Sequence, residues 1–136
     1  MNRIAATVTA VECVDNITVV SFEAAGQKMR MMALALNTPL KAGSRVLLGV
    51  KASHVSLAKE LDGVLSISNR LQVTVETVNS GALLASVKAR FADTLIESII
   101  TRESAERMNL LPGDRVTALI KASELSILSV DSDTPQ

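Results

Sequence analysis

The sequence predicts a mainly all-β protein made of two tandem copies of one small unit, with one short helix in the second copy. One observation is an internal repeat, because the stretch 43–57 recurs 70 residues later at 113–127, in register and without a gap. Both stretches follow the frame G-x-R-V, three residues, an aliphatic residue, and then K-A-S-x-aliphatic-S-aliphatic. The other observation is that Thr- and Val-rich runs with partial alternation are separated by turn residues, which is typical of strands. A repeat at a fixed period predicts a duplicated architecture.

The composition limits the kind of core that the chain can build. Of its 136 residues, 48% are apolar, but there is no Trp, no Tyr and only two Phe, so the core must be aliphatic. Each repeat unit has about 60–70 residues, which is near the lower size limit for an independent core. We therefore expect the units to pack on each other or on further copies.

The first copy is predicted to contain five strands and no helix. Turn residues at Asp15-Asn16 and Ala24-Ala25-Gly26 separate its first three strands, and the break at Thr38-Pro39 takes the place of a helix. The predicted strands are 3–13, 17–22, 28–36, 44–50 and 55–58, followed by a polar linker over 59–63.

The second copy repeats this order and adds a helix over 102–109, for which Thr101 is the predicted N-cap. A lead-in at 65–68 precedes the predicted strands 71–78, 83–91, 94–100, 116–120 and 124–128. Five strands with a helix between the third and fourth are typical of a small OB-like barrel. The predicted fold is therefore two tandem OB-like five-stranded barrels, with domains at 1–60 (a shortened unit), 64–130 and a flexible tail at 131–136.

At the level of its motifs, the second copy resembles a TOBE domain of the molybdate-binding Mop type, the unit of the molbindins. The resemblance is carried by Ser66-Ile67-Ser68-Asn69-Arg70-Leu71, Ile100-Thr101-Arg102-Glu103-Ser104, Leu111-Pro112-Gly113 and Val116-Thr117-Ala118-Leu119-Ile120-Lys121-Ala122-Ser123. The first copy matches more weakly, through Asn2-Arg3-Ile4 and Lys51-Ala52-Ser53. Two copies in one chain are similar to the tandem, di-Mop arrangement. The resemblance implies an OB-like barrel whose units bind oxyanions between neighbours.

The resemblance also implies a ligand, molybdate or tungstate, and a set of groups that hold it. Molybdate is a tetrahedral dianion without a proton at neutral pH, so its site requires hydrogen-bond donors and cations. The implied oxyanion-binding residues are Lys121, Ala122, Ser123, Thr101, Ser66 and Ser68, together with Lys51, Ala52 and Ser53 of the first copy. No catalytic residue and no direct ligand of a metal cation are predicted.

Departures from the family pattern add three auxiliary candidates. Ser68 stands where the family often has an arginine, and Arg70, two residues further on the same face of a strand, is the candidate substitute, with Arg3 as its counterpart in the first copy. His54 stands in place of Glu124 beside the first Lys-Ala-Ser. The first copy begins at Met1 without the serine lead-in and has no counterpart of Thr101. We therefore expect it to borrow donors from another unit.

Plainer interpretations compete with each of these assignments. A Lys-Ala-Ser sequence after a strand is more often a polar turn than a ligand site, and Thr101 is an N-cap whatever else it does. A histidine such as His54 is more often an ordinary surface turn residue. We interpret the methionines at 29, 31 and 32 as core or interface residues, and Cys13 as a buried small hydrophobe.

The residues and the family resemblance together favour one function over the others. The favoured one is a non-enzymatic molybdate (or tungstate) binding module for storage, buffering or homeostasis. The alternative is a regulatory or interaction module associated with a molybdate-type transporter ATPase or a regulator, with weak or vestigial anion binding. Nucleic-acid binding is disfavoured, because the net charge is zero and no Trp or Tyr is available for stacking. No paired-carboxylate, Cys/His or P-loop signature predicts an enzyme.

The sequence also predicts where the protein is located and how it assembles. The N-terminus does not resemble a signal peptide, no apolar run approaches membrane-spanning length, and there is one cysteine, so we expect a soluble cytoplasmic protein. Small aliphatic barrels with exposed strand edges favour self-association. The resemblance implies a trimer of the tandem chain, with a dimer as the second expectation.

Overall fold

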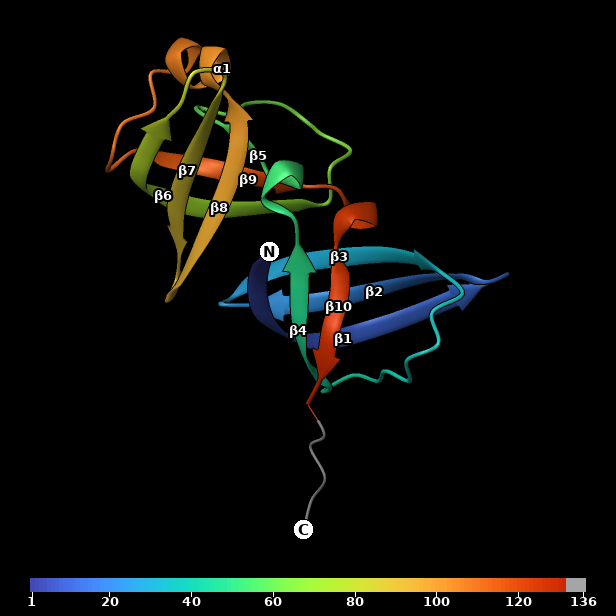
Figure 1. Cartoon of the computed structure of the whole chain (residues 1–136). Helices are drawn as coiled ribbons and strands as arrows, with labels where there is room; N and C mark the ends of the chain where they lie inside the picture. The colour runs from blue at the N-terminus through green and yellow to red at the C-terminus, as the bar shows by residue number, and fades with distance from the viewer. Residues whose placement is uncertain (132–136) are drawn as a thin grey trace.

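The computed structural model describes residues 1–131, which form two barrel-like β units stacked along one axis (Figure 1). Residues 132–136, which hold most of the predicted flexible tail, lie outside the described residues. The elements of the first repeat are β1 (Asn2–Val14), β2 (Ile17–Ala24), β3 (Gln27–Leu34), β4 (Arg45–Val50), η1 (Ala52–His54) and β5 (Ser56–Ala58). Those of the second repeat are β6 (Asn69–Ser80), β7 (Leu84–Phe91), β8 (Thr94–Thr101), α1 (Arg102–Arg107), β9 (Arg115–Ile120), η2 (Ala122–Glu124) and β10 (Ser126–Val130).

The ten predicted strands and the single α-helix are confirmed, with boundaries that shift by a few residues. Thr101 caps α1 as predicted, because its side-chain oxygen accepts a hydrogen bond from the Ser104 amide. The sequence did not reveal that each Lys-Ala-Ser opens a turn of 3₁₀-helix, at η1 and η2. The prediction that Cys13 is buried is wrong, because this residue is exposed.

The two units exchange their last strands. The first sheet has the order β10-β4-β1-β2-β3, and the second has the order β5-β9-β6-β7-β8. The short strand β5 leaves the first repeat to pair with β9, and β10 leaves the second repeat to pair with β4. The sequence predicts that residues 124–128 close their own unit, and the pairing of β10 with β4 corrects this prediction. The predicted boundaries 1–60 and 64–130 describe the sequence repeat, and the hydrogen-bonded sheets cross them.

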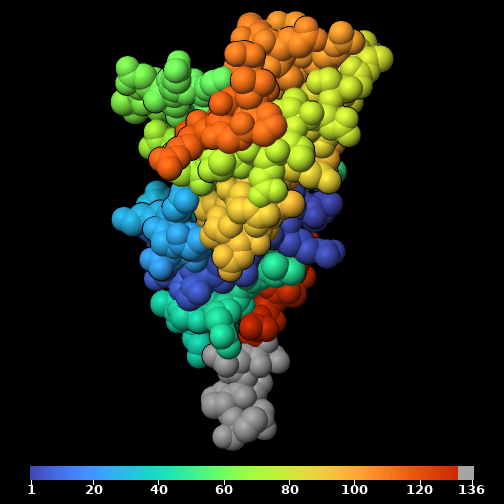
Figure 2. Space-filling view, turned by 90° about the vertical axis from the view of Figure 1, so that its left-hand side faces the viewer, coloured from blue at the N-terminus to red at the C-terminus, as the bar shows by residue number. Residues whose placement is uncertain are grey.

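The core is mainly aliphatic, as the composition predicts, and it includes Phe22 and Phe91 and extends through both units. Each long first strand carries a bulge at the equivalent place, between Val8 and Ala10 in β1 and between Val75 and Thr77 in β6. Such bulges bend a strand and increase its twist, which allows a five-stranded sheet to curl over a small core. Figure 2 shows the β7–β8 end of the second unit lying against the first unit, and β8 contacts β1 there. No helix in the described range is both long and apolar enough to cross a membrane.

The segment between the repeats is fastened to the second unit by Lys59. Its ammonium donates to the carbonyl oxygens of Met108 and Asn109 and to the Asp114 carboxylate, at 3.1, 2.9 and 3.0 Å. The Leu111 amide, which donates to the same carboxylate, and Lys59 together hold the pKa of Asp114 below its usual value. This fastening fixes where the chain enters the lead-in to β6.

Gly49 in β4 is the position that admits the exchanged strand β10. A Cβ atom placed there would lie 2.8 Å from Leu128 side-chain atoms, closer than packed carbon atoms approach. We predict that Gly49→Ala lowers the free energy of unfolding by about 1–3 kcal/mol, because overpacking forces strand or side chain to shift. Urea unfolding followed by circular dichroism measures the change.

The matched control is Gly81→Ala, whose added Cβ would meet only the Leu84 carbonyl oxygen, at 3.4 Å. We expect this control to unfold at the wild-type urea concentration or slightly above it. Equal effects of the two substitutions would show that the packing of Leu128 against β4 does not require a glycine at position 49.

Candidate functional site

A cleft of ≈ 300 Å³ lies at the junction of the two units. The second repeat contributes the lead-in before β6 and the turn η2, and the first repeat contributes one face of β2 and β3. The lining residues are Val19, Arg30, Met32, Ser66, Ile67, Ser68, Lys121, Ala122 and Ser123. The sequence analysis named Ser66, Ser68, Lys121, Ala122 and Ser123 as members of one site, and the structure brings all five together.

Arg30 is the residue of this cleft that the sequence analysis missed. It lies on β3, opposite Ser21 of β2, and its neighbours on the same face of the β2–β3 hairpin include Val19 and Met32. Arg30 supplies a second cation beside Lys121, in a cleft where the expected arginine of the lead-in is replaced by Ser68. No motif signals Arg30, because it belongs to the weaker repeat and reaches the cleft only through packing between the units.

Asn69 fixes the backbone that carries both cations. Its side chain is fully buried, its Oδ1 accepts from the Arg30 amide at 2.6 Å, and its Nδ2 donates to the Arg30 carbonyl at 2.9 Å. The same Nδ2 donates to the carbonyl of Ile120, the residue before Lys121, at 3.0 Å. One amide side chain therefore connects the edge strand of the first unit to the start of the η2 turn.

The η2 turn presents backbone donors as well as the lysine. Its own hydrogen bond runs from the Glu124 amide to the Lys121 carbonyl at 2.9 Å. That bond leaves the N–H groups of Ala122 and Ser123 outside the internal pairing of the turn. Such consecutive amides, next to a hydroxyl and a cation, form the kind of concavity that binds anions.

The charge of the cleft is entirely positive. None of its lining residues, all of which lie within residues 1–131, is acidic, while Arg30 and Lys121 each contribute one cation. The hydroxyls of Ser66, Ser68 and Ser123 add donors, and Val19, Ile67 and Met32 form an apolar wall. This arrangement suits a small anion without protons of its own, because the side chains at the polar wall can all donate.

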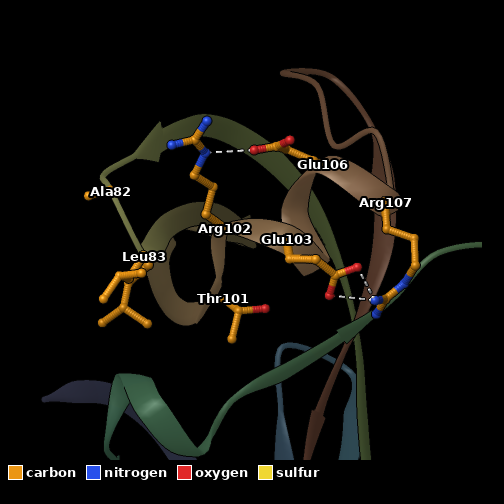
Figure 3. A pocket seen from close by; sticks show the side chains of 8 residues that line it. Ala82, Leu83, Thr101, Arg102, Glu103, Glu106 and Arg107 are labelled. Atoms are coloured by element: carbon orange, nitrogen blue, oxygen red, sulfur yellow. Dashed lines mark hydrogen bonds and ion pairs between the residues drawn. The ribbon is translucent and has the colours of Figure 1, made fainter.

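Thr101 lies in a different cleft within the chain. That cleft is formed by the start of β7 and by α1, and it is lined by Ala82, Leu83, Leu84, Thr101, Arg102, Glu103, Glu106 and Arg107 (Figure 3). Both arginines there are paired with glutamates one helical turn away, Arg102 with Glu106 and Arg107 with Glu103, each at 2.6 Å. Within one chain, Thr101 acts as a helix cap and does not join Lys121.

The three auxiliary candidates are also placed. Arg70 lines another cleft, together with Arg115 and the linker residues Glu60, Leu61 and Gly63, and does not line the one beside Lys121. Arg3 is exposed on β1, opposite Gly49. His54 extends from η1 to η2, where its Nδ1 lies 2.9 Å from Oε2 of Glu124. The two Lys-Ala-Ser turns are therefore neighbours at the junction.

The first Lys-Ala-Ser, residues 51–53, faces the second unit. The η1 turn packs against β8, and the buried hydroxyl of Ser98 in β8 donates to the Val55 carbonyl at 2.5 Å. On the other side of the junction, η2 packs against β3. Each turn thus faces the third strand of the opposite repeat.

The fold and the cleft define a class of protein: a duplicated OB-like unit with exchanged strands and a donor-lined cleft at the junction. Residues 65–127 match the model of the TOBE domain family. Most of the chain superposes on the crystal structure of the cytoplasmic molybdate-binding protein ModG with molybdate bound. The TM-score is 0.85 and the identity 31%, over 93% of this chain and 94% of that chain. The chain therefore belongs to the TOBE/Mop family, as a tandem member with the ModG architecture.

Two further relatives share part of the chain. The molybdenum import ATP-binding protein ModC of Brucella abortus (strain 2308) is 37% identical over 84 residues, or 61% of this chain. The chain spans 23% of the length of that protein. A molybdate-binding protein from Sporomusa ovata is 34% identical over 49% of this chain and 100% of its own, with a TM-score of 0.48.

We predict that Asn69→Ala lowers the free energy of unfolding by about 3 kcal/mol, because the buried Ile120 carbonyl and the partly buried backbone groups of Arg30 lose their hydrogen-bond partner. Thermal and urea unfolding measure this effect. The control is Asn79→Ala on the same strand, where the side chain is exposed and little change is expected. Equal stability of the two variants would contradict the role assigned to Asn69.

Proposed function

We propose that this protein binds molybdate or tungstate in the junction cleft, between Arg30 of the first unit and the Lys121–Ser123 turn of the second. The observation that carries the proposal is the acid-free cleft itself, with one cation from each unit and three hydroxyls from the second. The likeness to molybdate-bound ModG along nearly the whole chain supports the choice of ligand.

In this proposal the cations and the hydrogen-bond donors of the cleft have different roles. Lys121 and Arg30 balance the two negative charges of the tetrahedral anion. The amides of Ala122 and Ser123 and the hydroxyls of Ser66, Ser68 and Ser123 then donate to its oxygens. Phosphate carries a P–OH group near neutral pH, and no carboxylate of residues 1–131 lines the cleft to accept this proton. A polar group left without a partner costs about 1–3 kcal/mol, so we expect phosphate to bind about fivefold to a hundredfold more weakly.

The role that fits this chemistry is reversible holding of the oxyanion in the cytoplasm, for storage, buffering or homeostasis. Its relation to cytoplasmic ModG supports this location. Thr101, Lys51, Ala52 and Ser53, which the family resemblance also implied as ligands, stay predictions. None of these four residues lines the junction cleft, so the proposed site does not include them.

A second candidate function is that of an interaction module for a transporter ATPase. The 37% identity to part of ModC supports it, because the shared region belongs there to an ATP-binding import protein. Affinity purification of the tagged chain from its own host, with and without molybdate, tests this function. Recovery of an ATP-binding subunit would favour it.

Self-association also belongs to the proposal, as a trimer or a dimer. Two equivalent ends of the units expose large apolar side chains. Ile17 and Leu34 are paired at the open end of the first unit, and Leu83 and Leu84 lie at the corresponding end of the second, beside α1 (Figure 3). Surfaces of this kind on a small barrel favour contact with further copies.

We predict that molybdate binds the wild-type protein measurably in isothermal titration, and that Arg30→Ala and Lys121→Ala each weaken binding about tenfold to a hundredfold. The reason is that a hydrogen bond to a charged group contributes about 1.5–3 kcal/mol. The matched control is Arg70→Ala, which removes an arginine from the neighbouring cleft and should leave affinity unchanged. Absence of heat at high micromolar molybdate would refute the proposal. If Arg70→Ala weakened binding as much as Arg30→Ala, the anion would not be bound in the junction cleft alone, and the assignment of the site would be wrong.

For assembly, we predict that wild-type protein sediments as a trimer or dimer and that the double variant Leu34→Glu, Leu84→Glu sediments as a single chain. Two charges in an apolar contact would have to be desolvated without a partner. Analytical ultracentrifugation measures the mass, and Glu106→Gln on the exposed face of α1 is the control. An unchanged mass of the double variant would place the contact elsewhere.

A further inference from the structure

The two Lys-Ala-Ser turns have the same local geometry. Lys51 has φ −67° and ψ 143°, and Lys121 has φ −66° and ψ 144°. In both turns the amide three residues after the lysine donates to the lysine carbonyl at 2.9 Å. Any difference in what they bind must therefore come from the groups that face them.

The clamps behind the turns are equivalent as well. Asn69 holds Arg30 through the amide and carbonyl of that residue, as described above. Asn2, at the matching position of the first repeat, accepts from the Glu97 amide and donates to the Glu97 carbonyl, both at 2.8 Å. Arg30 and Glu97 thus occupy the same place, each on a third strand and each facing the Lys-Ala-Ser turn of the other repeat.

The charge at this place is reversed between the two halves of the junction. Beside the Lys121 turn the strand presents a guanidinium, and beside the Lys51 turn it presents a carboxylate. The Glu97 carboxylate is held by the Ser86 hydroxyl at 2.5 Å, and Ser86 is the counterpart of Val19 in the oxyanion cleft. The hydroxyl that could have donated to an anion is already used by Glu97.

Two other charged groups lie on this face of β7: Arg90, which is paired with Glu76 of β6, and Lys88, which is opposite Glu97. The equivalent pair in the first repeat is Ser21 and Arg30. The Ser21–Arg30 pair on β2 and β3 therefore carries one net positive charge, and the Lys88–Glu97 pair on β7 and β8 carries no net charge. The cation of Lys88 therefore does not restore what Glu97 removes.

We propose that Glu97 is a specificity-determining residue that closes the Lys51–Ser53 turn to oxyanions, so that the chain holds one anion at its junction and not two. The proposal rests on the proposed function for its ligand, but it concerns the other turn. A carboxylate within contact distance of a dianion disfavours binding by more than about a hundredfold at ordinary effective dielectric constants.

The test measures Lys51-dependent binding of molybdate, by equilibrium dialysis with elemental analysis, in wild type, Glu97→Arg and Glu97→Gln. Each is compared with the same protein carrying Lys51→Ala. Glu106→Arg makes the same change of charge on α1 and serves as the control. Thermal unfolding checks that Glu97→Arg remains folded, and Glu97→Gln, which retains the size of the side chain, is the second probe.

We expect Lys51→Ala to leave wild-type binding unchanged. We expect Glu97→Arg to gain about one molybdate per chain that Lys51→Ala removes, Glu97→Gln to gain a weaker one, and Glu106→Arg to gain none. Lys51-dependent binding in the wild type, or no gain in folded Glu97→Arg and Glu97→Gln, would overturn the inference. Loss of the proposed function is seen separately, as no binding that depends on Arg30 and Lys121 in the wild type. The gain in Glu97→Arg can be measured even then.

Discussion

The contact on which the rest of the structure depends is the pair of asparagine clamps at the junction. The backbone of Arg30 in β3 and that of Glu97 in β8 each receive the side-chain amide of an asparagine from the opposite repeat, Asn69 or Asn2. A sheet edge inside a protein must satisfy its N–H and C=O groups, and within residues 1–131 no further strand pairs with β3 or β8. An asparagine side chain has both a donor and an acceptor, so it substitutes for a missing strand residue. The clamps therefore hold the two units in direct hydrogen-bonding contact at the junction.

Strand exchange explains why the Lys-Ala-Ser turns lie at this junction. Each turn is the point at which the chain leaves one sheet and enters the other, from β4 to β5 and from β9 to β10. Neither sheet has its full set of five strands without the other repeat. The units should therefore unfold as one cooperative body, although each has only about 60–70 residues and would be marginal alone. The cleft gains rigidity from the same cause, because its two walls cannot separate without breaking strand pairs.

The limits of prediction from the sequence follow from these contacts. Local signals were sufficient for the strands and for the Thr101 cap. The family resemblance, which is carried by motifs within one repeat, grouped Ser66, Ser68 and Lys121. The exchange was not predictable in the same way, since β5 and β10 follow the same repeat motif and could pair within either unit. Arg30 depends on that packing, so only the structure brings it to Lys121, and Arg70, chosen by spacing along one strand, lies in another cleft.

Fusion of two copies also allows the junction to become asymmetric. In a symmetric pair of identical units, equivalent residues meet like with like at the axis. Here the equivalent positions 54 and 124 hold histidine and glutamate, which contact each other at 2.9 Å, a combination that identical copies could not form as a single pair. The same freedom allows arginine and glutamate at positions 30 and 97. Two identical copies that both carried the arginine would offer two equivalent anion clefts, and two copies with the glutamate would offer none. A tandem chain can keep one cleft and change the other, while the asparagine clamps and the exchanged strands remain the same on both sides.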